Sequence, residues 1–193
     1  MSGQDLNLGR LVHGYWRAHE WGLNAEGYLA LIHDVLSLGI RTFDHAACYG
    51  GFANEEAFGQ ALALEKGLRE QMTIVSKCGI VFPNAQLPEM KSKHYDNSRA
   101  HIVWSAERSV EKLQCGYLDL LLIHRPSPCA HPEEISVAFD DLHRRGLVRH
   151  LGVSNYSAHK FSMLQSYVDQ PLATNQIEIS RLHLARFEDG SLD

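Results

Sequence analysis

Four side chains of this sequence have the chemistry needed to pass a proton to a carbonyl group. Asp44 and Tyr49 lie in one segment, TFDHAACYGG, and Lys77 and His124 each end an apolar run further along the chain. A tyrosine is a poor acid at neutral pH because its ordinary pKa is about 10, but an ammonium within about 4–6 Å favours the phenolate and lowers that pKa. Asp44 would hold Lys77 charged and oriented, while His124 would hydrogen-bond a substrate carbonyl beside the phenol. Such a group suits protonation of a carbonyl oxygen while a hydride reaches its carbon.

The same residue types also allow two other interpretations. Asp44 and Lys77 can form an ion pair that only stabilises the fold, with Tyr49 as a loop aromatic. Asp44, His45 and His124 can together supply a single metal ion in a hydrolytic barrel. The chain has neither an H-E-x-x-H motif nor a close histidine pair on one strand, and Lys77 would repel a cation. We therefore predict no metal site.

These residues must be positioned by strands and helices that alternate along the chain. Short apolar runs rich in β-branched residues predict strands over 10–15, 42–46, 73–77, 117–124, 148–153 and 173–179. Capping residues, acidic first turns and terminal glycines predict helices over 24–39, 54–67, 98–116 and 132–146, and a fifth from 157. Repetition of strand and helix without adjacent hairpins implies parallel strands joined by right-handed crossovers.

Two architectures fit this alternation, a doubly wound sheet and a barrel. The phosphate-binding motifs G-x-G-x-x-G and G-x-x-x-x-G-K-[ST] are absent. Polar residues at or near predicted strand carboxyl ends favour the barrel, whose active sites assemble there; they are Asp44, Lys77, His124, Asn155 and Gln176. A closed (β/α)8 TIM barrel needs eight units in about 250 residues, and the sequence supplies about six. The chain ends in what reads as a loop, 187–193. We expect one incomplete barrel domain over residues 1–193.

Composition narrows the class of protein. Apolar residues make up 45% and charged residues 21% of the chain, as in ordinary soluble globular proteins. No apolar run approaches the length of a membrane span, and the first ten residues do not resemble a signal peptide, so we expect a cytoplasmic protein. The net charge of −5 argues against a nucleic-acid partner. The four cysteines form no C-x-x-C pair, and Cys48 and Cys78 are predicted to be small buried hydrophobic residues rather than nucleophiles.

The sequence resembles the aldo-keto reductase superfamily in five separate segments. They are GIRTFDHAACYGGFANEEAFG (39–59), VSKCG (75–79), LDLLLIHRP (118–126), GLVRHLGVSNY (146–156) and ATNQIEIS (173–180). They follow the family's order and spacing over nearly the whole chain. The VSKCG and HRPSP forms look most like a bacterial branch of predicted oxidoreductases. The resemblance implies a (β/α)8 barrel of the aldo-keto reductase type that is incomplete at its C-terminal end.

The resemblance also implies roles for individual residues. The family's general acid is a tyrosine, which matches Tyr49, and its supporting lysine and aspartate match Lys77 and Asp44. Its substrate-orienting histidine matches His124. The residues that hold the nicotinamide carboxamide match Ser154, Asn155 and Gln176. The implied activity is reduction of a small aldehyde or ketone by NADPH, less often NADH, without a Rossmann fold. The rival interpretation is a non-catalytic barrel, either a binding or regulatory subunit or a truncated product.

Other expectations concern the walls of the pocket and the missing units. Trp16 follows the first strand and is predicted to border the nicotinamide or substrate, or to lie in the core. Arg125 with residues 126–132 is predicted to form one wall, and the segment 80–97, with Lys91, Lys93 and Tyr95, forms another wall or a solvated loop. His45 replaces a small residue of many relatives and is expected to narrow the pocket or titrate near it. Without the family's later segments we expect weak NADPH binding, and self-association through open sheet edges.

Overall fold

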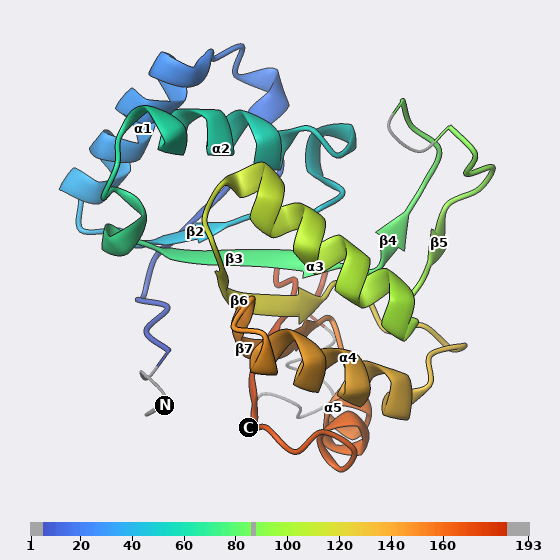
Figure 1. Cartoon of the computed structure of the whole chain (residues 1–193). Helices are drawn as coiled ribbons and strands as arrows, with labels where there is room; N and C mark the ends of the chain where they lie inside the picture. The colour runs from blue at the N-terminus through green and yellow to red at the C-terminus, as the bar shows by residue number, and fades with distance from the viewer. Residues whose placement is uncertain (1–5, 86–87, 185–193) are drawn as a thin grey trace.

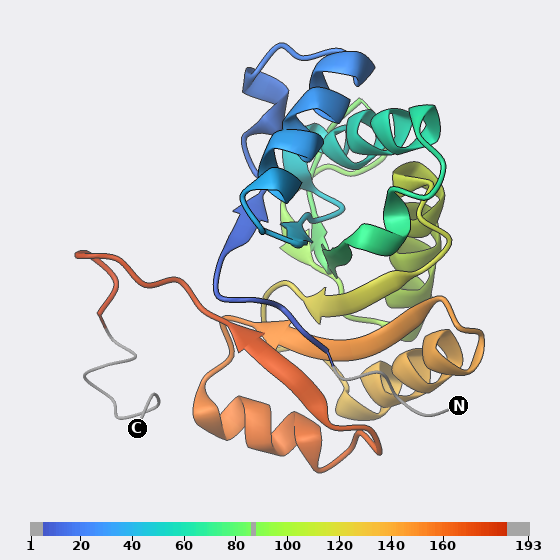
Figure 2. The same ribbon diagram turned by 90° about the vertical axis from the view of Figure 1, so that its left-hand side faces the viewer.

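The computed structural model describes residues 6–85 and 88–184 of the chain. Its centre is a parallel sheet of six strands in the spatial order β1-β2-β3-β6-β7-β8. These strands are β1 (Val12–Gly14), β2 (Thr42–Asp44), β3 (Thr73–Cys78), β6 (Leu118–Ile123), β7 (Val148–Ser154) and β8 (Leu172–Gln176). Figures 1 and 2 show that the sheet curls into part of a barrel, with helices along its outer face. All six predicted strands are confirmed, each within two or three residues of its expected bounds.

Five α-helices connect and cover the strands. They are α1 (Ala25–Ser37), α2 (Asn54–Leu64), α3 (Arg99–Leu113), α4 (Pro132–Arg144) and α5 (Ala158–Gln165). Three begin at a side-chain cap, because Asn24, Ser98 and Ser157 each accept a hydrogen bond from the backbone amide three residues on. Short 3-10 turns lie at Ala18–Glu20, Tyr49–Gly51 and Arg69–Gln71.

The second helix begins at Asn54 as predicted, but its predicted C-terminal end was wrong. The helix ends at Leu64 rather than near Gly67, and Ala53 stands at its N-cap without a side-chain bond. The Asn54 amide instead donates hydrogen bonds to the carbonyls of Tyr15 and Trp16. It therefore ties the start of α2 to the segment after β1, a long-range role that sequence spacing does not reveal.

Alternation along the strands separates two packed layers. On the outer face, Phe43, Ile74 and Leu121 belong to the main core with the apolar stripes of the helices. On the inner face, Val75, Leu120 and Leu122 form a smaller cluster, against which Leu6 and Leu8 pack. Because side chains two residues apart share a face of a strand, Lys77 extends from the same inner face as Val75.

The segment 80–97 contains a hairpin that the sequence did not indicate. Strands β4 (Ile80–Val81) and β5 (His94–Tyr95) pair antiparallel, and each has only two residues. Runs this short carry no readable alternation, so the pairing was missed. The two edges of the six-stranded sheet are β1 and β8, and self-association through them stays a prediction. The predicted terminal loop 187–193 lies outside the described residues. Within the described ranges, no helix has the length and apolar character to cross a membrane.

Candidate active site

The polar residues expected at the strand carboxyl ends do gather around one pocket. Asp44 ends β2, Lys77 lies one residue before the end of β3, His124 follows β6, and Ser154 and Gln176 end β7 and β8. Tyr49 opens the 3-10 turn after β2. A pocket of about 780 Å³ lies over this edge of the sheet. Its lining includes Trp16, Asp44, Cys48, Tyr49, His124, Arg125, Ser154, Asn155 and Gln176.

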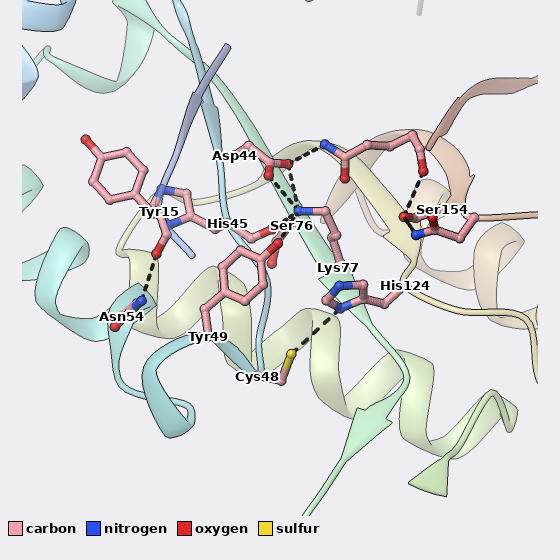
Figure 3. Close-up of polar contacts among 12 residues, drawn as sticks. Tyr15, Asp44, His45, Cys48, Tyr49, Asn54, Ser76, Lys77, His124 and Ser154 are labelled. Carbon is pink, nitrogen blue, oxygen red and sulfur yellow. Dashed lines mark hydrogen bonds and ion pairs between the residues drawn. The ribbon is translucent and has the colours of Figure 1, made fainter. Parts of the chain in front are cut away.

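Lys77 is the centre of the site. Its side chain is only 1% exposed, and its ammonium lies 2.7 and 2.8 Å from the two carboxylate oxygens of Asp44. The same Nζ donates to the His45 carbonyl at 2.8 Å and to the Tyr49 hydroxyl oxygen at 3.1 Å. Burial lowers the pKa of Lys77, and the Asp44 carboxylate opposes that change. Figure 3 shows these contacts converging on one nitrogen.

The Tyr49 hydroxyl is arranged as a hydrogen-bond donor toward the pocket. Its oxygen accepts from the Lys77 ammonium, and no residue in the described part of the chain accepts a hydrogen bond from it. Tyr49 is half-buried and lines the pocket. Its proton is therefore free to be given to a molecule bound there.

The predicted lowering of the Tyr49 pKa was wrong. Burial raises the pKa of this phenol above its ordinary value, and the Asp44 carboxylate raises it further. The physical reason is that the charge of Lys77 is matched by Asp44 at 2.7 Å, so Tyr49 faces an ion pair rather than an isolated cation. At neutral pH the phenol keeps its proton.

His124 is a neutral imidazole with one nitrogen already engaged. Burial, with Lys77 next in effect, lowers the pKa of His124 to about 3. Its Nδ1 lies 3.7 Å from the Cys48 Sγ, and its ring meets the Tyr49 ring edge to face at 5.8 Å. Burial raises the pKa of Cys48 to about 11, so Cys48 is a thiol that can donate to Nδ1. In the tautomer in which Nδ1 accepts from this thiol, the imidazole proton sits on Nε2.

The sequence interpretation missed this role of Cys48. Cys78 is buried as predicted, with 2% of its surface exposed, whereas Cys48 is half-buried and lines the pocket. The one available signal was its position next to Tyr49, on a turn expected at the strand end. A contact between residues 76 positions apart is set by the fold and not by local pattern.

A group of amide and hydroxyl side chains forms the wall at β7 and β8. The Ser154 hydroxyl donates to the Gln176 carbonyl at 2.9 Å, the Asn155 amide donates to the Ser154 hydroxyl at 2.8 Å, and the Gln176 amide lies 3.3 Å from Asp44 Oδ1. Asn155 has a φ of 59°, a left-handed conformation that asparagine tolerates. Side-chain amides present both donors and acceptors, so this wall is chemically complementary to a carboxamide such as that of nicotinamide.

His45 does not take part in the pocket, which corrects two expectations. Its side chain is fully buried on the opposite side of β2 from Asp44, with its ring 4.5 Å from the rings of both Tyr15 and Phe58. Burial lowers the pKa of His45 to about 3, so it neither narrows the pocket nor titrates near neutral pH. Asp44, His45 and His124 consequently do not converge. Among the residues the structure describes, no group of three or more histidine, cysteine or acidic side chains is placed to hold a metal ion.

The pocket walls were predicted only in part. Trp16 is 69% exposed at the rim, so its assignment to the core is excluded. Arg125 lines the pocket, but residues 126–132 do not. From the hairpin, Ile80, Phe82, Lys93 and Tyr95 line it, while Lys91 lies outside the lining.

Comparisons with known proteins agree with this geometry. Residues 10–189 match the sequence profile of the aldo/keto reductase family. The chain is 46% identical to the uncharacterized oxidoreductase YcsN of Bacillus subtilis and 47% identical to the oxidoreductase YdhF of Escherichia coli, each over 98% of this chain and 63% of the relative. It is 41% identical to a 6-dehydroglucose reductase of Agrobacterium fabrum, over 97% of this chain and 63% of that protein. The chain thus spans about 63% of the length of these curated relatives.

A solved structure shows the same architecture. The glycerol dehydrogenase AKR11B4 of Gluconobacter oxydans superposes with a TM-score of 0.80 at 29% sequence identity, covering 97% of this chain and 57% of that one. Aldo-keto reductases use NADPH or NADH, in keeping with the carboxamide-complementary wall described above. The six-stranded half-barrel, the ordered motifs and the profile match establish that this chain belongs to the aldo/keto reductase family.

Proposed function

We propose that this site reduces the carbonyl group of a small aldehyde or ketone to an alcohol, with NADPH as cofactor and Tyr49 as general acid. One observation supports this most directly: the Tyr49 hydroxyl lies 3.1 Å from the Lys77 ammonium at the pocket, with its own proton unused. When bound, NADPH supplies the hydride that adds to the carbonyl carbon. We choose NADPH over NADH because members of the family resembled by this sequence use NADPH more often.

Four residues of the chain have separate roles in the proposed proton transfer. Tyr49 donates its proton to the carbonyl oxygen as negative charge develops there, because an incipient alkoxide is a stronger base than a phenolate. Lys77 already donates a hydrogen bond to the phenol oxygen, so it stabilises the phenolate that remains until solvent restores the proton. Asp44 keeps Lys77 charged and fixed at 2.7 Å. His124 holds the carbonyl through Nε2–H and thereby aligns the oxygen with the phenol.

The wall at β7 and β8 is suited to hold the nicotinamide. Ser154, Asn155 and Gln176 would bind the carboxamide, since their hydroxyl and amide groups can both donate and accept. Trp16, exposed at the rim of the same pocket, would border the ring or the substrate. These assignments place the cofactor against the strand ends and leave Tyr49 and His124 to face the carbonyl compound.

Replacing Tyr49 with Phe tests the proposed acid. The change removes one oxygen and should lower kcat of NADPH-dependent aldehyde reduction by about 10²–10⁴, while NADPH affinity stays near that of the wild type. The control is Tyr167→Phe, which removes the hydroxyl of an exposed tyrosine and should leave both values unchanged. Turnover is followed by loss of NADPH absorbance. Full activity in Tyr49→Phe would refute the mechanism, and NADPH binding without any wild-type turnover would favour a non-catalytic barrel.

A further inference from the structure

Two cations in the pocket wall have no counter-charge. Lys93 lies one residue before β5, and Arg125 directly follows His124; both side chains line the pocket. In the described ranges, neither side chain forms an ion pair or donates a hydrogen bond. The backbone carbonyl of Arg125 accepts from the Asn97 amide at 3.1 Å.

The acidic residues of the pocket lining lie apart from these two cations. Asp44 is paired with Lys77 at 2.7 Å. Glu178, the other acidic residue of the lining, follows β8, and its backbone amide donates to Asn155 Oδ1 rather than meeting Lys93 or Arg125. The wall that carries Lys93 and Arg125 is therefore a positive region. Both cations line the same pocket as His124 and Tyr49. Their charges help to lower the pKa of His124, and Arg125 also acts to lower the pKa of Tyr49. A cleft of one sign of charge raises the local concentration of ligands of the opposite sign.

The two side chains suit recognition of a carboxylate. A guanidinium presents paired N–H donors that match the two oxygens of a carboxylate, and a lysine adds a compact point charge. Phe82 and Tyr95 line the same wall, so an apolar spacer between the anionic group and the carbonyl would have surface to contact. His124 and Arg125 are adjacent in sequence and line the same pocket, so a ligand that contacts both would carry its carbonyl and its anionic group a short distance apart.

We propose that Lys93 and Arg125 form an anion subsite that selects aldehydes or ketones carrying a carboxylate near the reacting carbonyl. This inference rests on the proposed function, because it names the class of substrate for the same site. Arg125 follows His124 and Lys93 belongs to the hairpin segment, whereas Ser154 and Asn155 lie at the end of β7, so we assign the subsite to the substrate and not to the cofactor.

A matched pair of aldehydes tests the subsite by turnover. The wild type should prefer 4-carboxybenzaldehyde over methyl 4-formylbenzoate by about tenfold or more in kcat/KM at low ionic strength, and added salt should reduce the preference. Arg125→Gln and Lys93→Gln should each lose most of it without changing NADPH affinity. Lys91→Gln, in the same connection but outside the pocket lining, should keep it. Equal rates for acid and ester, or a weakened affinity for NADPH in place of a lost preference, would overturn the subsite.

A binding measurement separates the subsite from the reaction. Calorimetric titration with 4-(hydroxymethyl)benzoate and with its methyl ester compares the two product-like ligands without any turnover. Tighter binding of the acid, lost in Arg125→Gln and kept in Lys91→Gln, supports the subsite even where no aldehyde is reduced, a result that would refute only the proposed function. Equal binding of acid and ester refutes the subsite whatever the activity.

Discussion

Lys77 carries a full charge into a part of the molecule where water cannot solvate it. Transfer of an isolated ammonium into such a place costs several kcal/mol, and a paired carboxylate offsets that cost only when the geometry is good. Asp44 provides both oxygens, and the His45 carbonyl takes a third hydrogen bond. The sequence allowed two interpretations of these residues, a structural ion pair and a proton-transfer group. The same set of contacts serves both.

Removal of the ammonium tests this coupling. Lys77→Met should lower the free energy of unfolding by about 3–5 kcal/mol, because the Asp44 carboxylate would stay buried without its cation. The double variant Asp44→Asn/Lys77→Met should recover part of that loss, since it leaves no buried charge unpaired. Urea unfolding at pH 7 measures both values. A single variant within about 1 kcal/mol of the wild type would show that the pair is effectively solvated.

The thiol of Cys48 should fix which nitrogen of His124 carries the proton. In Cys48→Ser a hydroxyl keeps a donor beside Nδ1, whereas Cys48→Val removes it with little change of shape. We expect the ¹⁵N spectrum of His124 to show a protonated Nε2 and an unprotonated Nδ1 in the wild type and in Cys48→Ser. The two nitrogen signals should move toward each other in Cys48→Val as tautomers mix. Identical spectra in all three proteins would contradict the assignment.

The residue types of the site could be predicted from the sequence, but their electrostatics could not. Tyr49, Lys77 and Asp44 were recognisable from motif and strand position. The Tyr49 pKa is raised first by burial of the phenol and then by the Asp44 carboxylate, which also pairs with Lys77 at 2.7 Å. The spacing of residues in a sequence encodes neither the burial of a loop residue nor the distances between its charged neighbours.

At the scale of elements, strands and capped helices were predictable because their signals are local. The strand β6 was predictable because five of its six residues are apolar. The Ser and Asn caps were predictable because the first backbone amides of a helix need acceptors. The hairpin β4–β5 and the hydrogen bonds of Asn54 at the start of α2 were not predictable, because both join residues far apart in the sequence. The ring of Tyr15 packs on His45 and Phe58, and its carbonyl accepts from Asn54; these contacts join three elements at one point.

Glu55 is a buried residue of α2 whose side chain connects this helix to β3 and α3. Its carboxylate accepts from the hydroxyls of Ser76 and Ser109, and burial raises its pKa. Glu55→Leu should lower the free energy of unfolding by about 2–4 kcal/mol, since two buried hydroxyls lose their acceptor. Glu56→Leu, at the neighbouring and largely exposed position, should change it by about 0.5 kcal/mol or less. Chemical denaturation measures the free energy of unfolding of both variants. Equal losses of stability would show that the hydrogen bonds of Glu55 do not stabilise the fold.

At the scale of the molecule, the curved sheet separates the pocket on its inner side from the apolar core on its outer side. Neighbouring residues of one segment can therefore lie in different environments. Asp44 faces the inner side with Lys77 and the pocket, whereas His45, the next residue, lies among aromatic rings of the outer layer. Neither ring nitrogen of His45 has a hydrogen-bond partner in the described part of the structure. A charged imidazole there would lack both water and a counter-ion, so the folded state holds His45 neutral.

This burial makes the stability of the whole chain depend on pH in a stated direction. The pKa of His45 is lowered from 6.5 to about 3 in the folded state, so below about pH 6.5 the unfolded chain binds a proton that the folded chain does not, and stability falls as pH falls toward 3. His45→Phe removes that proton and should reduce the loss between pH 7 and pH 5 by about 2 kcal/mol. His159→Gln, at an exposed position of α5, should leave the pH dependence unchanged. Urea unfolding at pH 7, 6 and 5 measures all three proteins, and parallel pH profiles for wild type and His45→Phe would mean that His45 is protonated within the fold.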